Sequence, residues 1–71
     1  MPILLAPTMS PLRIVKIRLE PKLVKHLASL GLIEGEVVEV LESRGGATIV
    51  KVKEGRLALD SATSRGILVA A

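Results

Sequence analysis

The 71-residue sequence contains no cysteine and no phenylalanine, tyrosine or tryptophan. The absence of cysteine excludes disulfide bridges and thiolate metal ligands. Because phenylalanine, tyrosine and tryptophan are absent, the core has to be built from Ile, Leu and Val, and the aromatic platforms that usually stack on nucleic-acid bases are missing. The single histidine cannot form a zinc site of the usual Cys/His kind. The chain must therefore fold through aliphatic packing and strand pairing alone.

Long apolar runs are also absent, since no segment approaches the ~20 apolar residues that a membrane-spanning helix requires. The apolar start, residues 1–7, has no basic residue before it and does not resemble a signal peptide. We expect this segment to form an edge strand and the protein to be cytoplasmic. A chain of 71 residues is near the lower limit for a single core, so residues 1–71 are expected to form one domain.

Charge is distributed unevenly along the chain, whose net charge is +3. Residues 1–33 carry five basic side chains and one acidic one, whereas residues 34–71 carry five basic and six acidic ones. A basic surface of this kind suits an acidic partner, although a solvated face without a partner has the same composition.

The first regular element predicted is a strand over residues 12–19, where apolar and polar side chains alternate. Val15, Ile17 and Leu19 are expected to share its buried face. A helix is then predicted to open at Pro21, because proline is tolerated at the first helical position.

Leucines at positions 23, 27 and 30 follow helical spacing, so they form one apolar stripe, and Leu30 is expected to lie in the core. The opposite, exposed side of the helix is predicted to carry the lysines and His26. Gly31 occupies the position of a left-handed C-cap, after which Leu32 can fold back onto the last helical turn.

The remainder of the chain favours short strands separated by glycine-containing turns. Strands are predicted over residues 36–42, 47–53, 56–59 and 67–69, with a single helical turn from Asp60 to Ser64 before the last one. The predicted fold class is therefore mainly β, a small barrel of five to six short strands with one α-helix inserted after an N-terminal strand. Closure of the barrel would remove most exposed strand edges.

The order of these elements resembles the FeoA family, the small SH3-like cytosolic proteins of bacterial and archaeal ferrous-iron uptake. The matching segments are LGL (30–32), EGEVVEV (34–40), a glycine-containing hairpin, RLAL (56–59), a turn containing Ala62 and ILV (67–69). The resemblance covers roughly residues 12–69. It departs from the family where RLEP (18–21) replaces the charged, glycine-containing stretch that usually precedes the helix.

The resemblance implies an accessory protein that contacts the cytosolic GTP-binding part of a FeoB-type iron permease and reaches the membrane only through that partner. It implies no enzymatic activity, and no catalytic residue, cofactor or metal site is assigned. The same SH3-like module also forms the C-terminal domain of DtxR-type repressors. Since the chain starts at Met1 with no winged-helix segment before the module, a free-standing member is expected.

Two surfaces are candidates for partner contact. One is the join between the helix and the next strand, with Ile33 as the best exposed candidate. The other is the outer strand face, where basic residues would meet an acidic partner. The residues assigned to partner binding are Lys22, Lys25, Leu32, Ile33 and Arg56.

Three alternatives remain open from the sequence. A basic SH3-like barrel could bind RNA or DNA, although the acidic second half and the lack of aromatic residues disfavour it. Iron could be bound directly by oxygen ligands from Glu34, Glu36, Glu39 or Asp60. Two copies could also pair through the apolar segments 3–5 and 67–69 to give a homo-oligomer.

Overall fold

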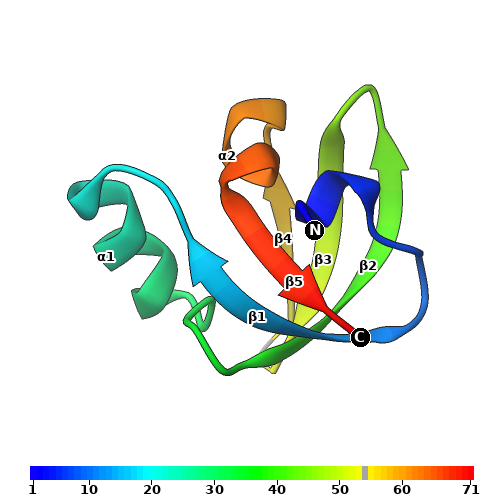
Figure 1. Ribbon diagram of the computed structural model, residues 1–71, viewed down its shortest axis with the longest axis horizontal. Coiled ribbons are helices and arrows are strands. Elements are labelled where there is room, and N and C mark those ends of the chain that lie inside the picture. Colours follow the sequence, from blue (N-terminus) through cyan, green and yellow to red (C-terminus); the bar gives the residue numbers. More distant parts are fainter. Residues whose placement is uncertain (54) are drawn as a thin grey trace.

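The computed structural model describes residues 1–53 and 55–71, and within them five strands form one antiparallel sheet (Figure 1). The strands are β1 (Pro11–Ile17), β2 (Val37–Arg44), β3 (Ala47–Val52), β4 (Gly55–Leu59) and β5 (Ile67–Ala70). Helix α1 (Pro21–Ser29) lies between β1 and β2, the short helix α2 (Ser61–Gly66) joins β4 to β5, and a 3₁₀ turn, η1 (Ile3–Leu5), precedes β1. The mainly β fold class is confirmed.

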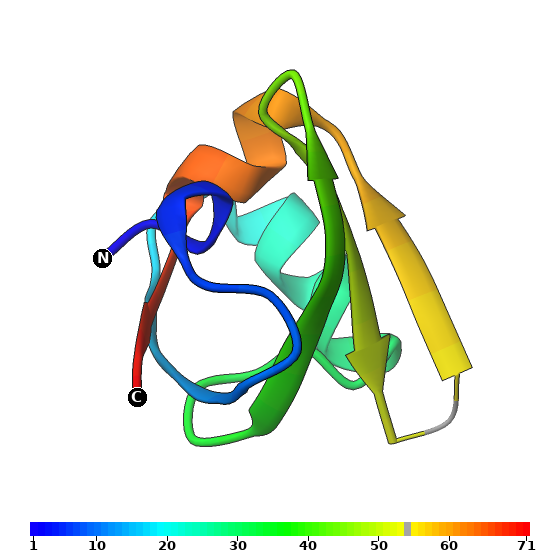
Figure 2. The ribbon, with the colours of Figure 1, turned by 90° about the vertical axis from the view of Figure 1, so that its right-hand side faces the viewer.

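The sheet is strongly bent, and its strands follow the order β4-β3-β2-β1-β5 (Figures 1 and 2). β2, β3 and β4 lie side by side, and β4 is the outermost of them in Figure 2. The two edge strands are therefore β4 and β5, with α2 connecting them on the open side of the barrel.

The core is aliphatic, as the lack of aromatic residues requires. Its members come from every strand, from η1 and from α1, and most alternate with exposed residues along the strands. They are Ile3, Ala6, Leu12, Ile14, Leu27, Leu32, Val38, Val40, Val50, Val52, Leu59, Ile67 and Val69.

The predicted inner face of the first strand is wrong at Val15, whose side chain is 48% exposed. A register shift between Ile14 and Lys16 in the pairing of β1 with β5 interrupts the alternation. Such a bulge leaves one residue unpaired, so the residues that face inward are Leu12 and Ile14 before it, with Ile17 partly buried after it.

The end of α1 is the predicted glycine C-cap. Gly31 has φ +98°, and its N–H donates to the Ala28 carbonyl at 3.0 Å. The N–H of Leu32 donates to the Leu27 carbonyl at 2.9 Å, which completes the Schellman pattern. The chain thereby reverses at Gly31, and Leu32 enters the core.

The N-terminal segment does not form the expected edge strand. Only its first residues pair with β5: the Met1 amino group donates to the Val69 carbonyl at 2.9 Å, and the Val69 N–H donates to the Met1 carbonyl at 2.7 Å. Pro2 and Pro7 cannot donate to a strand ladder, and between them the chain coils into η1 and buries Ile3.

Candidate functional site

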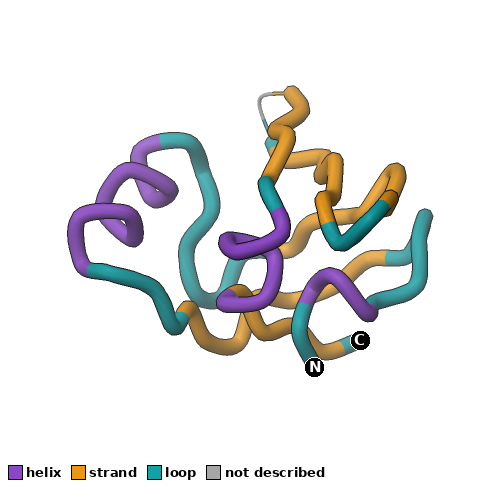
Figure 3. Tube along the Cα trace, turned by 90° about the horizontal axis from the view of Figure 1, so that it is seen from above, coloured by secondary structure: helices purple, strands orange, loops and turns teal. Residues whose placement is uncertain are grey.

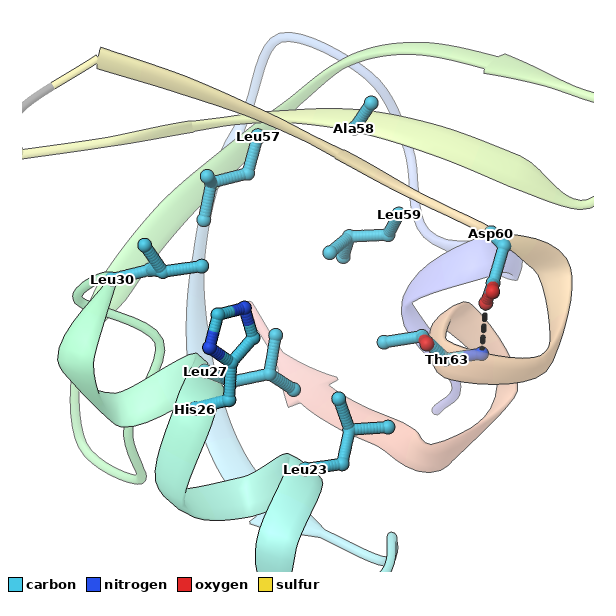
Figure 4. Close-up of a pocket in the computed structure, with 9 residues that line it drawn as sticks. All are labelled: Leu23, His26, Leu27, Leu30, Leu57, Ala58, Leu59, Asp60 and Thr63. Carbon is cyan, nitrogen blue, oxygen red and sulfur yellow. Dashed lines mark hydrogen bonds between the residues drawn. The ribbon is translucent and has the colours of Figure 1, made fainter.

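An open groove lies between α1 and β4, with a volume of about 190 Å³ (Figure 4). Leu23 and Leu27 of α1, with Leu30 at the C-cap of the helix, form one wall. Leu57 and Leu59 of β4 face them from the other wall (Figure 4). Leucine side chains therefore line the middle of the groove, and polar groups of His26, Asp60 and Thr63 lie among the remaining lining residues.

A second hollow, of about 440 Å³, continues the first past the C-terminal end of α1. The two hollows share Leu30 and Leu57, so we treat them as one site and call it the α1–β4 groove. At this end the lining changes from leucine side chains to Gly31, Lys53 and Arg56. The α1–β4 groove thus combines an apolar centre with a basic end.

The groove exists because α1 stands to one side of the sheet (Figures 1 and 3). Leu27 is the only residue of the helix that is fully buried. Leu23 is partly buried against the core, and Leu30 is 38% exposed, so the prediction that Leu30 is a core residue is wrong. The reversal at Gly31 gives the core position to Leu32 instead, which leaves Leu30 on the groove wall.

The groove also borders the backbone of β4. Leu57, Ala58 and Leu59 all line it, although the side chains of consecutive strand residues point to opposite faces. In the sheet β4 pairs with β3 and lies at the end of the strand order. The edge of β4 therefore opens into the groove.

Charged groups lie at both ends of the groove. Arg56 is exposed on β4, and its cross-strand neighbour on β3 is Lys51. At the other end, Asp60 accepts a hydrogen bond from the Thr63 backbone N–H at 2.8 Å (Figure 4). This bond from the Thr63 N–H, with a further contribution from the Thr63 side chain, lowers the pKa of the Asp60 carboxyl.

Of the residues predicted to bind a partner, Arg56 is the one that lines the groove. Lys22 and Lys25 are exposed on α1, and Ile33 is 46% exposed beyond the end of the helix. Leu32 is 0% exposed, because the turn at Gly31 directs it into the core. Its assignment as a surface contact is therefore wrong.

His26 was missed as a groove residue. It is exposed, as predicted, and its ring also faces the groove, which was not predicted (Figure 4). Its spacing carried a signal, since it follows Leu23 by three positions and precedes Leu30 by four, which places it beside the leucine stripe.

Metal-binding clusters are absent from the part of the chain that the structure describes: no three His, Asp or Glu side chains there are arranged to hold a metal ion. Of the proposed iron ligands, Glu36 instead forms an ion pair with Lys53 at 3.7 Å. Among the described residues, no helix has the length and apolar character needed to cross a membrane.

A five-stranded, bent antiparallel sheet with a helix inserted after the first strand is an SH3-like fold. The sequence matches the FeoA domain family over residues 1–71, and the chain belongs to this family. No curated protein sequence is significantly similar to the chain.

Solved structures share the fold at low sequence identity. A crystal structure of the iron uptake regulatory protein FeoA has 24% identity and a TM-score of 0.85, with 97% of this chain and 93% of that one covered. The solution structure of a FeoA protein from Chlorobium tepidum has 21% identity and a TM-score of 0.86, covering 97% and 68%. Iron(II) transport protein A from Clostridium thermocellum has 20% identity and a TM-score of 0.88, covering 100% and 45%.

Proposed function

We propose that this protein is a small accessory protein of ferrous-iron uptake that contacts the cytosolic GTP-binding part of a FeoB-type iron permease. Membership of the FeoA family supports a role in ferrous-iron transport. Two of its structural neighbours are described as an iron uptake regulatory protein and an iron(II) transport protein. The observation that carries the contact with a partner is the α1–β4 groove.

The groove suits a protein partner because an exposed apolar channel with a charged rim is typical of such surfaces. Leu30 and Leu57 sit at its centre, where the two hollows meet. Arg56 at its basic end would meet an acidic group of the partner. Further contacts are proposed outside the groove, from Lys22 and Lys25 on α1 and from Ile33 beyond the end of the helix.

In this proposal the protein is cytoplasmic, reaches the membrane only through the permease, and has no catalytic step of its own. Any effect on GTP hydrolysis acts through the partner. The apolar groove gives the chain a means of binding, and the partner supplies the nucleotide site.

The test is an NMR titration of the labelled chain with the GTP-binding domain of the cognate permease, at two salt concentrations. We expect shifts in residues 23–31 and 55–59, where the groove lies. Leu30→Ser should weaken binding about tenfold, since it removes a buried apolar contact of roughly 1.5 kcal/mol. The matched control is Val15→Ser, a truncation of another exposed aliphatic residue on β1, which should leave the affinity unchanged.

Absence of shifts with the GTP-binding domain would overturn the proposal. Salt-sensitive shifts on addition of RNA or DNA instead would favour the nucleic-acid alternative, because phosphate contacts release counterions. Equal losses in Leu30→Ser and Val15→Ser would show that the binding surface is not the groove.

A further inference from the structure

The two edge strands of the sheet differ in what covers them. The outer edge of β5 is partly occupied by the N-terminus, because Met1 and Val69 exchange backbone hydrogen bonds in both directions. β4 lies at the other end of the strand order, and its Leu57, Ala58 and Leu59 line the groove. An edge strand presents backbone N–H and C=O groups that an added strand can pair with.

We propose that the partner binds by adding a strand to the edge of β4, through an extended segment that alternates apolar side chains with others and carries an acidic residue opposite Arg56. This inference rests on the proposed function and specifies the chemistry of the docking segment. Strand addition supplies affinity through main-chain hydrogen bonds and specificity through the pockets that receive alternate side chains.

The register of β4 predicts which side chains the added strand needs. Residues directly opposite each other in an antiparallel pair share one face of the sheet. Leu57 and Leu59 point into the α1–β4 groove, so the residues opposite them should be apolar (Figure 4). The residue opposite Ala58 lies on the outer face, where a small or polar side chain fits.

An acidic residue is expected on the added strand because of the charges near Arg56. Arg56 is the last in a row of three cross-strand neighbours on β2, β3 and β4. In this row Glu39 of β2 faces Lys51 of β3, and Lys51 faces Arg56 of β4. Like charges directly opposite each other in a sheet are unfavourable. An Asp or Glu on an added strand would lie next to Arg56 and offset this repulsion.

The same charges disfavour pairing of β4 with β4 of a second copy. In a symmetric antiparallel pair centred on Leu57, two Arg56 side chains would share the outer face, each beside a Lys51. Four positive charges would then lie on one face, with a Glu39 beside each Lys51, and residues 55–59 of the second copy would bring no acidic side chain to offset the two arginines. Positive charge on an edge strand is a common protection against self-association, and here it selects an acidic partner.

The first arm of the test uses the full chain and the GTP-binding domain, with amide hydrogen exchange as the readout. We expect slower exchange at alternate residues of β4, those whose N–H groups point away from β3. Arg56→Glu should weaken binding about fivefold, since a cross-strand charge pair contributes up to about 1 kcal/mol. Lys16→Glu is the matched control, because Lys16 is an exposed cation on β1, three strands away along the sheet.

The second arm uses synthetic peptides of about eight residues, a usual strand length, that alternate valine with threonine. One peptide carries glutamate in place of a central threonine, and the other carries lysine there. The glutamate peptide should slow amide exchange in β4 of the unmodified chain, and the lysine peptide should bind about fivefold more weakly. This preference should reverse with Arg56→Glu.

The outcomes separate the two proposals. If the GTP-binding domain binds the groove while exchange in β4 is unchanged, strand addition is wrong and the proposed function stands. If the domain does not bind, the proposed function fails, and the peptide experiment alone tests strand addition. Slower amide exchange in β4, with a preference for the glutamate peptide that reverses in Arg56→Glu, supports strand addition. Absence of peptide binding, or an equal response to both peptides, overturns it.

Discussion

The side-chain hydroxyls of Thr48 and Ser64 lie 2.9 Å apart in the interior, and their contact joins β3 to α2. The Ser64 hydroxyl also donates to the Asp60 carbonyl at 2.8 Å. Since its one hydrogen is used there, the Thr48 hydroxyl is the donor of the pair. These bonds tie the short helix α2, next to the groove, to β3.

Thr48→Val should destabilise the fold by about 1 kcal/mol, because it removes one hydrogen bond but leaves the donation from Ser64 to Asp60 intact. Ser64→Ala should cost more, about 1–3 kcal/mol, since it leaves the buried Thr48 hydroxyl without its hydrogen-bond acceptor. Urea denaturation measures both changes. The double variant should lose less than the sum of the two, and strict additivity would show that the hydroxyls do not interact.

The bond between Asp60 and Thr63 should make stability depend on pH. The pKa of Asp60 is lowered from its ordinary value of 3.8 by this bond, so the folded-state pKa lies below that of the unfolded chain. The stabilisation is therefore complete at neutral pH and is lost as the pH falls through the folded-state pKa. The difference in melting temperature between the unmodified chain and Asp60→Ala should shrink at acid pH.

The control for this pH effect is Glu34→Ala, which removes an exposed carboxylate in the turn before β2. Its melting temperature, measured at the same pH values, shows the effect of removing a carboxylate that caps no helix. A difference for Asp60→Ala that stays constant across this range would show that the carboxylate charge does not contribute to the cap.

Gly31→Val should destabilise the fold through the backbone, by about 1–2 kcal/mol. The φ of +98° is unfavourable for a branched side chain, whereas no atom beyond the two neighbouring residues in the chain lies within 4 Å of the position that a Cβ would take. The cost is thus conformational and not steric. Gly31→Asn should cost less, because asparagine tolerates positive φ better than valine does. Thermal unfolding of the two variants measures this, and equal losses would contradict the backbone explanation.

Gly66→Ala tests a glycine that is required by close packing and not by its backbone conformation. A Cβ here would lie 2.8 Å from the Arg18 carbonyl oxygen and would also overlap the Leu19 side chain. The Arg18 N–H donates to the Gly66 carbonyl at 2.7 Å, so the backbones cannot separate without losing that bond. We expect a loss of about 1–3 kcal/mol in urea denaturation. Addition of Leu19→Ala should recover part of it, and no recovery would place the clash at the carbonyl alone.

Local patterns in the sequence predicted the elements better than their long-range placement. The glycine C-cap at Gly31 is confirmed, and the strand predicted over residues 47–53 is present as β3, because each depends on neighbouring residues in the chain. The bulge at Val15 was not predictable, since it arises from the pairing of β1 with β5 at the far end of the sequence.

The groove was missed for the same physical reason. Periodicity identifies an apolar stripe on α1 but not how much of the stripe the sheet covers, and this decides whether Leu30 is core or groove wall. Arg56 was assigned to a partner surface from its charge. Its position next to the end of α1 depends on how β2, β3 and β4 pair after the helix, and pairing between strands cannot be read from charge.

Ile33→Glu tests how far the docking surface extends beyond the groove. Ile33 is 46% exposed, so the charged replacement should leave the fold intact while weakening binding of the GTP-binding domain several-fold through loss of an apolar contact. Calorimetric titration measures the affinity, and circular dichroism checks the fold. An unchanged affinity would confine the contact to the α1–β4 groove. An unfolded spectrum would instead show that the partly covered Ile33 side chain is needed by the core, as Leu32 beside it is.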